Sequence, residues 1–214
     1  MNRDLSSIRR DYQFEDLLED QASTDPMQMF DAWLEKAIDA CPDDPTAMVL
    51  STVDSEQRPH ARVVLLKQRD SQGFSFFTNY DSDKGQQLAD NANACLTFFW
   101  PALSRQVRIE GKVKKVTRRV SENYFASRPK GSQLAASVSC QSHVVASRDV
   151  LTSAFKDLEN KYENAPQVPC PDNWGGYVLE ANYLEFWQGR PSRLHDRLRY
   201  RLIDHQWQLE RLAP

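Results

Sequence analysis

The first half of the chain combines one helical pattern with several strand patterns. Asp25-Pro26 is typical of a helix start, with an N-cap residue followed by proline at the first helical position. Apolar residues then recur at helical spacing until Pro42, which predicts a helix with one buried face. Those residues are Phe30, Trp33, Leu34, Ala37 and Ile38. Strands separated by turns, the pattern of a β-meander, are predicted over 47–53, 61–67 and 74–78.

The middle of the chain predicts two more strands among short helices. Ser82 is a candidate N-cap for a helix that ends near Asp90, and an apolar strand is predicted over 94–100. Residues 106–116 alternate, with apolar side chains on one face and charged or polar side chains on the other. Helices are predicted over 121–127, 132–136 and 147–162.

The C-terminal part returns to strand patterns, which are predicted over 176–179, 184–188, 194–203 and 207–212. Strands joined by hairpins, with helices inserted between them, predict a mainly β fold with peripheral helices, built as an antiparallel barrel. The strand–helix alternation of a parallel doubly wound sheet is absent. Residues 1–22 are polar and predict a flexible N-terminal segment with a short helix near 5–12, whereas 23–214 predict a single domain.

Composition excludes several classes of protein. Hydrophobic residues make up 40% and charged residues 27% of the 214 positions, an ordinary balance for a globular domain. The net charge of −3 is unlike the basic balance of most nucleic-acid-binding domains. No stretch approaches the roughly 18 consecutive apolar residues of a membrane helix, and the charged start is not a secretory signal. We therefore expect neither a nucleic-acid partner nor a membrane.

Cysteines and histidines predict neither a disulfide framework nor a metal site. The four cysteines lie far apart without a Cys-x-x-Cys pair, and the four histidines form no cluster. This usage is typical of a reduced, cytoplasmic protein. Glycine is scarce, at 7 residues, and no glycine-rich phosphate loop is present. A phosphorylated ligand would therefore be bound by Arg, Lys, Ser and Tyr side chains.

Residues 193–197 (RLHDR) form the sharpest local feature. In an extended chain Arg193, His195 and Arg197 share one face, while Leu194 lies on the other. Three cationic or potentially cationic groups on one face suit an anionic ligand. The same pattern also fits a half-buried strand whose charged face is solvated.

Residues 62–67 (RVVLLK) form an apolar strand bracketed by two cations. Both ends could face ligand phosphates, or the charges could simply mark the strand ends. Arg62 and Lys67 are five positions apart and fall on opposite faces. A common site would therefore need a bulge, a strong twist, or two ligand groups on different sides.

Two weaker features suggest a phosphate clamp and a stacking surface. Tyr124 and Arg128 are four positions apart and are neighbours on a helix face. With the nearby hydroxyl of Ser132 they make a candidate phosphate clamp, although a plain helix end has the same pattern. Trp187 could stack on a flat ring or simply fill the core.

Together these segments resemble the pyridoxine/pyridoxamine 5′-phosphate oxidase family, in the order and spacing of that family. The resemblance covers nearly the whole chain, and it is specific because the 193–197 segment is absent from generic flavin-binding barrels. The segments that carry it are 8–12 (IRRDY), 62–67, 77–79 (FTN), 105–107 (RQV), 124–133 (YFASRPKGSQ), 141–142 (QS), 174–176 (WGG), 185–189 (EFWQG), 193–197 and 211–214 (RLAP).

The resemblance implies an FMN-binding split β-barrel that forms a homodimer, with two FMN molecules in clefts between the subunits. It implies that Arg62 and Lys67 serve different phosphates. The implied FMN contacts are Arg62, Val63, Val64, Leu65, Leu66, Lys67, Phe77, Thr78, Lys84, Gln106, Gln141, Ser142, Trp187 and Arg197. The implied substrate contacts are Lys67, Tyr124, Arg128, Ser132, Arg193, Leu194 and His195, with Arg9 and Tyr12 as candidates for an N-terminal lid.

The resemblance also implies an activity: oxidation of pyridoxine or pyridoxamine 5′-phosphate to pyridoxal 5′-phosphate, with O2 as electron acceptor and H2O2 as product. Arg193 and His195 would be the catalytic pair that positions the pyridine ring. One alternative is a related flavoenzyme that acts on another ring, which the full set of substrate-side residues disfavours. The other is a non-catalytic carrier of FMN or pyridoxal phosphate, which only analogy disfavours.

At one position the chain departs from the family pattern. The family usually has Ser-Arg-Lys where this chain has Ser82-Asp83-Lys84. An aspartate therefore stands where the family's arginine would meet the FMN phosphate, and Asp83 is not among the predicted FMN contacts.

Overall fold

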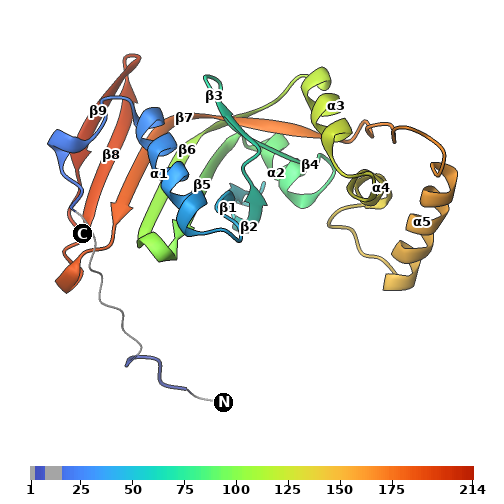
Figure 1. The fold of residues 1–214 in the computed structure, drawn as a ribbon, viewed down its shortest axis with the longest axis horizontal. Helices are drawn as coiled ribbons and strands as arrows, with labels where there is room; N and C mark the ends of the chain where they lie inside the picture. The colour runs from blue at the N-terminus through green and yellow to red at the C-terminus, as the bar shows by residue number, and fades with distance from the viewer. Residues whose placement is uncertain (1–2, 8–15) are drawn as a thin grey trace. The chain divides into compact units, whose positions relative to one another are not determined.

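The computed structural model describes residues 3–7 and 16–214 (Figure 1). The chain divides into two compact units. The terminal unit comprises Met1–Val49, Cys95–Glu110 and Ala181–Pro214. The central unit comprises Leu50–Ala94 and Gly111–Glu180. The helix expected near 5–12 lies largely outside the described residues. The single domain expected over 23–214 stays a prediction.

The described strands form one nine-stranded sheet in the order β2-β1-β5-β6-β7-β4-β3, with β8 pairing with β7 and β9. The ladders β3–β4, β4–β7, β7–β8 and β8–β9 are antiparallel, as the hairpin pattern predicts. The strands are β1 (Ala47–Val53), β2 (Pro59–Leu65), β3 (Gln68–Asp70), β4 (Gly73–Asn79), β5 (Asn93–Trp100), β6 (Arg105–Lys115), β7 (Trp174–Gln188), β8 (Asp196–Ile203) and β9 (Gln206–Arg211).

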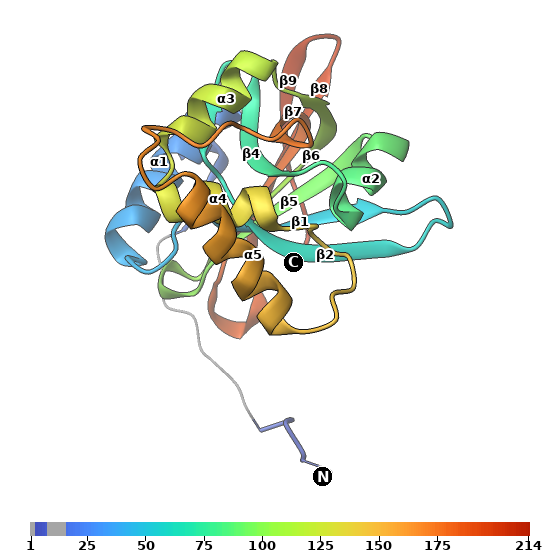
Figure 2. The same cartoon turned by 90° about the vertical axis from the view of Figure 1, so that its right-hand side faces the viewer.

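Helix starts follow the capping signals in the sequence. The Asp25 carboxylate accepts a hydrogen bond from the amide of Met27, and the Ser82 hydroxyl accepts one from the amide of Gly85. In the central unit, α4 and α5 lie side by side (Figure 2). The helices are α1 (Pro26–Ala40), α2 (Asp83–Asp90), α3 (Arg118–Ser127), α4 (Lys130–Val138) and α5 (Arg148–Lys161).

Aromatic contacts join α1 to the strands of the terminal unit. The ring of Phe30 meets that of Phe98 edge-on at 5.1 Å between centroids, and Trp33 meets Phe186 at 5.2 Å. Phe30, Phe98 and Phe186 are fully buried. This confirms the buried face predicted for the helix, although Ile38 at its far end is 44% exposed.

A second cluster in the central unit consists of Phe125, Leu134, Val168 and Trp174. The last helix, α5, has no buried residue, although apolar residues recur at helical spacing along one of its sides. Its apolar side chains at 155 and 158 are only partly buried against this cluster, while Val150 and Leu151 are exposed. Periodicity predicts the packed side of a helix, but not how deeply that side is buried.

Three strand predictions are corrected. The expected strands at 176–179 and 184–188 form a single strand, β7, whose exposed polar residues between 180 and 183 resemble a turn in sequence. The polar strand β3 lacks an apolar pattern and was missed. The strand expected from Leu194 starts at Asp196, because Ser192 and Arg193 adopt left-handed conformations with φ of 57° and 61°.

Candidate active site

A cavity of about 610 Å³ lies in the central unit, a size typical of small-molecule sites. Strands β2 and β4 and helices α3 and α4 supply most of its wall. It brings together eleven of the residues predicted from the sequence: Arg62, Val63, Val64, Leu65, Lys67, Phe77, Thr78, Lys84, Tyr124, Arg128 and Gln141.

Stacked aromatic rings form one wall of the cavity. Phe77 and Tyr124 stack at 3.9 Å between ring centroids, and Trp174 continues the stack at 5.7 Å from Phe77. Phe77 lies opposite Gly176 in the β4–β7 ladder. A Cβ atom on that glycine would lie 2.7 Å from the Phe77 ring, so only glycine lets the ring approach the sheet here.

Arg62 is held by acceptors of its own unit. One terminal nitrogen donates to the carbonyl of Leu50 at 3.2 Å and to the hydroxyl of Thr52 at 2.5 Å. The other donates to the amide oxygen of Gln87 at 3.0 Å. Burial lowers the pKa of Arg62, and the nearby carboxylate of Asp83 counteracts this. The guanidinium is therefore positioned before any ligand binds.

Lys84 belongs to a polar group at the start of α2. Its ammonium donates to the side chain of Gln141 at 3.2 Å, and that same oxygen accepts from the Thr78 hydroxyl at 2.9 Å. Burial and the nearby Arg62 lower the pKa of Lys84, whereas Asp83 raises it. The exposed Asp83 therefore acts electrostatically on both cations of this part of the cavity.

Arg128 carries the clearest sign of a missing partner. Its Nη1 atom is buried and has no hydrogen-bond partner among the described residues. The guanidinium lies 4.8 Å from the centroid of the Trp174 ring. Burial lowers the pKa of Arg128, but a guanidinium stays charged at neutral pH. An unsatisfied buried donor of this kind is costly unless a ligand accepts its hydrogen bond.

The cavity fits a phosphorylated ligand with a flat ring. Four cations, Arg62, Lys67, Lys84 and Arg128, line it together with an aromatic wall. These groups suit FMN or a phosphorylated pyridine, because guanidinium and ammonium groups bind phosphates while aromatic faces stack on rings. The sequence missed Asn79, Ala135, Ala136, Ser139 and Trp174 as lining residues. Asn79 and Trp174 lie in family-like motifs, which was the available signal.

A second set of predicted residues lies in the terminal unit. Trp187 pairs with Arg197 across the β7–β8 ladder, and the His195 ring lies 4.7 Å from the Trp187 ring. Gln106 and Arg193 belong to the same unit. The prediction that residues 193–197 are extended, with Arg193, His195 and Arg197 on one strand face, is wrong. Arg193 lies in a 3-10 turn before β8, and Leu194 is 69% exposed.

His195 is held in a defined tautomer. The backbone amide of Arg190 donates to its Nδ1 atom at 3.0 Å, so Nδ1 must be the acceptor. The proton of the neutral ring therefore resides on Nε2. Partial burial and the positive charge of Arg193 lower the pKa of His195, which favours this neutral form at pH 7.

Several predicted residues stand apart from the cavity wall. Leu66 is buried, while Ser132 and Ser142 are described but do not line the cavity. Ser142 has a left-handed backbone, with φ of 72°. Arg9 and Tyr12 lie outside the described residues. No helix in the described part of the chain is long and apolar enough to cross a membrane.

Two family models match the chain. The model described as pyridoxamine 5′-phosphate oxidase matches residues 34–162, and that of the pyridoxine 5′-phosphate oxidase C-terminal dimerisation region matches residues 174–214. The chain belongs to the pyridoxine/pyridoxamine 5′-phosphate oxidase family. The resemblance seen in the sequence is thereby confirmed.

Curated members of this oxidase family are similar over their whole length. The pyridoxine/pyridoxamine 5′-phosphate oxidase 1 of Hydrogenovibrio crunogenus is 52% identical over 221 residues, which cover 100% of this chain and 99% of that protein. The corresponding oxidase of Pseudomonas entomophila is 52% identical over 216 residues and covers all of both chains. The prediction of an enzyme of this family is confirmed.

Solved structures confirm the fold class. PhzG from Burkholderia lata 383, in complex with tetrahydrophenazine-1-carboxylic acid, has a TM-score of 0.88 at 27% identity, covering 94% of this chain and 99% of that one. An FMN binding protein of Nostoc punctiforme, related to pyridoxamine 5′-phosphate oxidase, has a TM-score of 0.73 at 17% identity, covering 90% and 100%. The oxidase family and its FMN-binding fold together imply a flavin cofactor.

Proposed function

We propose that the chain catalyses the FMN-dependent oxidation of pyridoxine or pyridoxamine 5′-phosphate to pyridoxal 5′-phosphate, with O2 as electron acceptor and H2O2 as product. The observation that carries this proposal is the cavity that four cations, Arg62, Lys67, Lys84 and Arg128, line together with stacked aromatic rings. Relatives that bear the name of this activity are 52% identical over the full chain.

In this proposal, side chains of the central unit hold both phosphorylated molecules. Arg62 and Lys84 serve the FMN phosphate, while the backbone and side chains of residues 63–67 and Thr78 contact the rest of the cofactor. Lys67, Tyr124, Arg128 and Ser132 hold the substrate phosphate. Bound FMN would supply the redox chemistry, as acceptor of a hydride from the 4′ carbon of the substrate and as donor of those electrons to O2.

His195 acts as a hydrogen-bond donor toward the substrate. Because the amide of Arg190 occupies Nδ1, the neutral ring offers an Nε2–H group and has no free lone pair for a proton. Arg193 places a permanent positive charge beside it. This pair orients the pyridine ring against the flavin. The tautomer supports a positioning role for His195 rather than that of a general base.

We further propose a homodimer that binds FMN between its subunits. The cavity is lined by the central unit, whereas Gln106, Trp187, Arg193, His195 and Arg197 belong to the terminal unit. The matched C-terminal dimerisation region begins at residue 174 and includes four of these five. A second copy would supply the terminal-unit residues to each cavity.

The four free cysteines support a cytoplasmic location.

The similarity to PhzG favours one alternative, a flavoenzyme that acts on a different ring. Lys67 and Arg128 separate the two candidates, because cations in the cavity wall suit a substrate that carries a phosphate. Purified protein is incubated in air with FMN and either pyridoxine 5′-phosphate or unphosphorylated pyridoxine, and aldehyde and peroxide are measured. We expect pyridoxine 5′-phosphate to give aldehyde and peroxide in equal amounts, and unphosphorylated pyridoxine to give neither. Absence of turnover with both pyridoxine and pyridoxamine phosphates would refute the proposal.

A further inference from the structure

Glu185 is a buried acid outside the cavity wall. It lies on β7 in the terminal unit, and its side chain is only 4% exposed. Its neighbours on the same strand face are Tyr183 and Trp187. On β8, Arg199 lies directly opposite Glu185, and Arg197 lies opposite Trp187. An ionised carboxylate at such a depth is costly unless it is paired and hydrogen-bonded.

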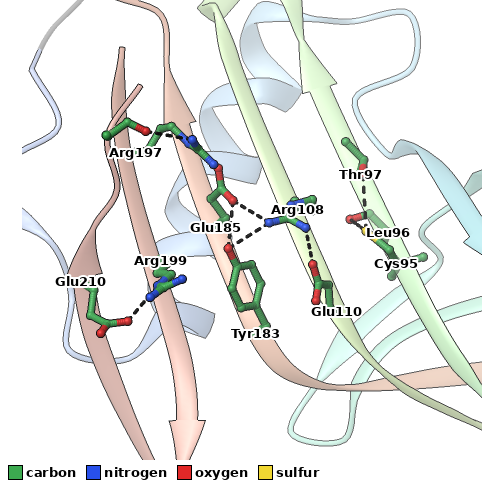
Figure 3. Close-up of polar contacts among 11 residues, drawn as sticks. Cys95, Leu96, Thr97, Arg108, Glu110, Tyr183, Glu185, Arg197, Arg199 and Glu210 are labelled. Carbon is green, nitrogen blue, oxygen red and sulfur yellow. Dashed lines mark hydrogen bonds and ion pairs between the residues drawn. The ribbon is translucent and has the colours of Figure 1, made fainter. Parts of the chain in front are cut away.

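Both oxygen atoms of this carboxylate are occupied (Figure 3). Oε1 accepts a hydrogen bond from Nε of Arg197 at 2.8 Å. Oε2 accepts from a terminal nitrogen of Arg108 at 2.7 Å and from the hydroxyl of Tyr183 at 2.9 Å. Arg108 also pairs with Glu110 and so has two carboxylate partners, whereas Glu185 is the one carboxylate paired with Arg197 among the described residues.

The hydrogen bonds keep Glu185 ionised. Burial alone would raise the pKa of its carboxyl, but the bonds from Arg197, Arg108 and Tyr183 outweigh burial and lower it. The acceptor for Arg197 is consequently a full negative charge at neutral pH. A charge-assisted bond to Nε restrains the side chain more strongly than a neutral acceptor would.

A second anchor fixes the other end of the Arg197 guanidinium. Its Nη1 atom donates to the carbonyl of Ala213 at 2.9 Å. The backbone of Arg197 is held by the same segment, because its carbonyl accepts from the amide of Leu212 at 2.9 Å. Nε and Nη1 are both engaged inside the unit, and Nη2 has no hydrogen-bond partner among the described residues, so it is the nitrogen available to a ligand.

We propose that Glu185 is a positioning residue for Arg197, holding its guanidinium so that Nη2 points at the flavin. This inference rests on the proposed function, in which Arg197 contacts FMN. Arg197 is hydrogen-bonded directly to Glu185, and it pairs with Trp187 across the β7–β8 ladder. Loss of the negative charge would leave Arg108 paired with Glu110 but would remove the one carboxylate partner that Arg197 has among the described residues, so the Arg197 guanidinium would be less restrained.

The chain offers a matched control on the same sheet. Glu210 on β9 accepts hydrogen bonds from Arg199 at 2.8 Å and from Arg201 at 2.9 Å, so it also joins two guanidinium groups. Its hydrogen bonds and ion pairs among the described residues go to Arg199 and Arg201 and do not include Arg197. Its substitution tests whether the loss of any such carboxylate is enough to weaken flavin binding.

The test is a double-mutant cycle on FMN affinity. Apoproteins of the wild type, Glu185→Gln, Arg197→Met, the double variant and Glu210→Gln are titrated with FMN, and flavin fluorescence is followed. We expect Glu185→Gln to weaken binding about tenfold in the wild-type background but less than about twofold beside Arg197→Met, since coupled residues are not additive. Glu210→Gln should leave the affinity unchanged.

A second readout needs no flavin. The Nε–H proton of Arg197, bonded to a buried carboxylate, should exchange slowly with solvent in nitrogen-15 spectra of the apoprotein, and Glu185→Gln should accelerate this exchange at least about tenfold. Thermal unfolding of each variant monitors the fold. If Glu185→Gln does not fold, the double-mutant cycle is repeated with Glu185→Asp. This variant keeps the negative charge, but its side chain is one methylene shorter, so the carboxylate lies farther from Arg197.

The outcomes separate this inference from the proposed function. Wild-type protein that binds no FMN would overturn the proposed function, and the exchange of the Arg197 proton would still test the restraint. Wild-type protein that binds FMN, with additive effects of Glu185→Gln and Arg197→Met, would overturn the role of Glu185 alone. Equal weakening by Glu210→Gln would do the same, since it would show a general effect on the sheet.

Discussion

Replacing Asp83 by arginine should tighten FMN binding. Asp83 is the first residue of α2, directly after the N-cap Ser82, where unpaired amides attract anions. Its carboxylate acts on the cavity cations Arg62 and Lys84, because it raises the pKa of both. A phosphate that binds to these cations therefore meets one negative charge from the protein at the same place.

The size of the effect follows from the charge change and the exposure of the site. Two unit charges about 5 Å apart in water-like surroundings interact by about 0.8 kcal/mol. Replacing a charge of −1 by +1 removes a repulsion and adds an attraction of the same size, which together amount to about 1.6 kcal/mol. Counterions screen part of this energy because Asp83 is exposed. We therefore expect a gain of about tenfold at most in affinity.

The assay is titration of apoprotein with FMN at low and moderate salt. Asp90→Arg is the matched control, because Asp90 is the last residue of the same helix and the substitution changes the net charge equally. Asp83→Arg should tighten binding more than Asp90→Arg, and the difference should shrink as salt is added. Unchanged or weaker affinity for Asp83→Arg at both salt levels would refute the reasoning and leave Asp83 as a simple helix-start residue.

Three further predictions concern the substrate side. Arg193→Leu and His195→Leu should each lower turnover far more than FMN affinity; variants with normal turnover and lost FMN would show that the ligand assignment is wrong. The Gln side chain of His195→Gln places an N–H donor near the position of Nε2, whereas the shorter Asn side chain of His195→Asn places its amide near Nδ1. We therefore expect His195→Gln to retain at least about tenfold more turnover than His195→Asn. The reverse order would contradict the Nε2–H tautomer. Arg128→Met should raise KM for the phosphorylated substrate by about tenfold or more while leaving thermal stability unchanged or higher, because a buried donor without a partner is removed; an unchanged KM would argue against a phosphate at Arg128.

Local signals in the sequence were sufficient for most elements. The alternation over 106–116 predicts β6, and Asp25 and Ser82 predict two helix starts because capping depends on immediate neighbours. The break expected inside β7 was wrong, because a strand continues through exposed polar residues when its hydrogen bonds come from neighbouring strands. Such pairing is non-local and leaves no mark in the strand's own pattern.

Only part of the candidate site could be predicted from local sequence patterns. Arg62 and Lys67, five positions apart, both line one cavity, which strict alternation alone would not have placed together. The stacked ring of Trp174 comes from a strand about fifty residues beyond Tyr124 and meets it only through the fold. The tautomer of His195 depends on the backbone amide of Arg190, and no side-chain pattern reports that contact.

The central claim is an oxidase whose flavin sites each combine the cavity of one copy with the terminal-unit residues of another. Mixing two impaired variants, Arg128→Met and Arg193→Leu, under conditions that exchange subunits tests it directly, provided the rate is measured at a substrate concentration well below the KM of the Arg128 variant. Each mixed dimer would have one intact site, so random exchange should restore about a quarter of the wild-type rate of pyridoxine 5′-phosphate oxidation. A mixture that stays as impaired as its components, despite verified exchange, would contradict the claim.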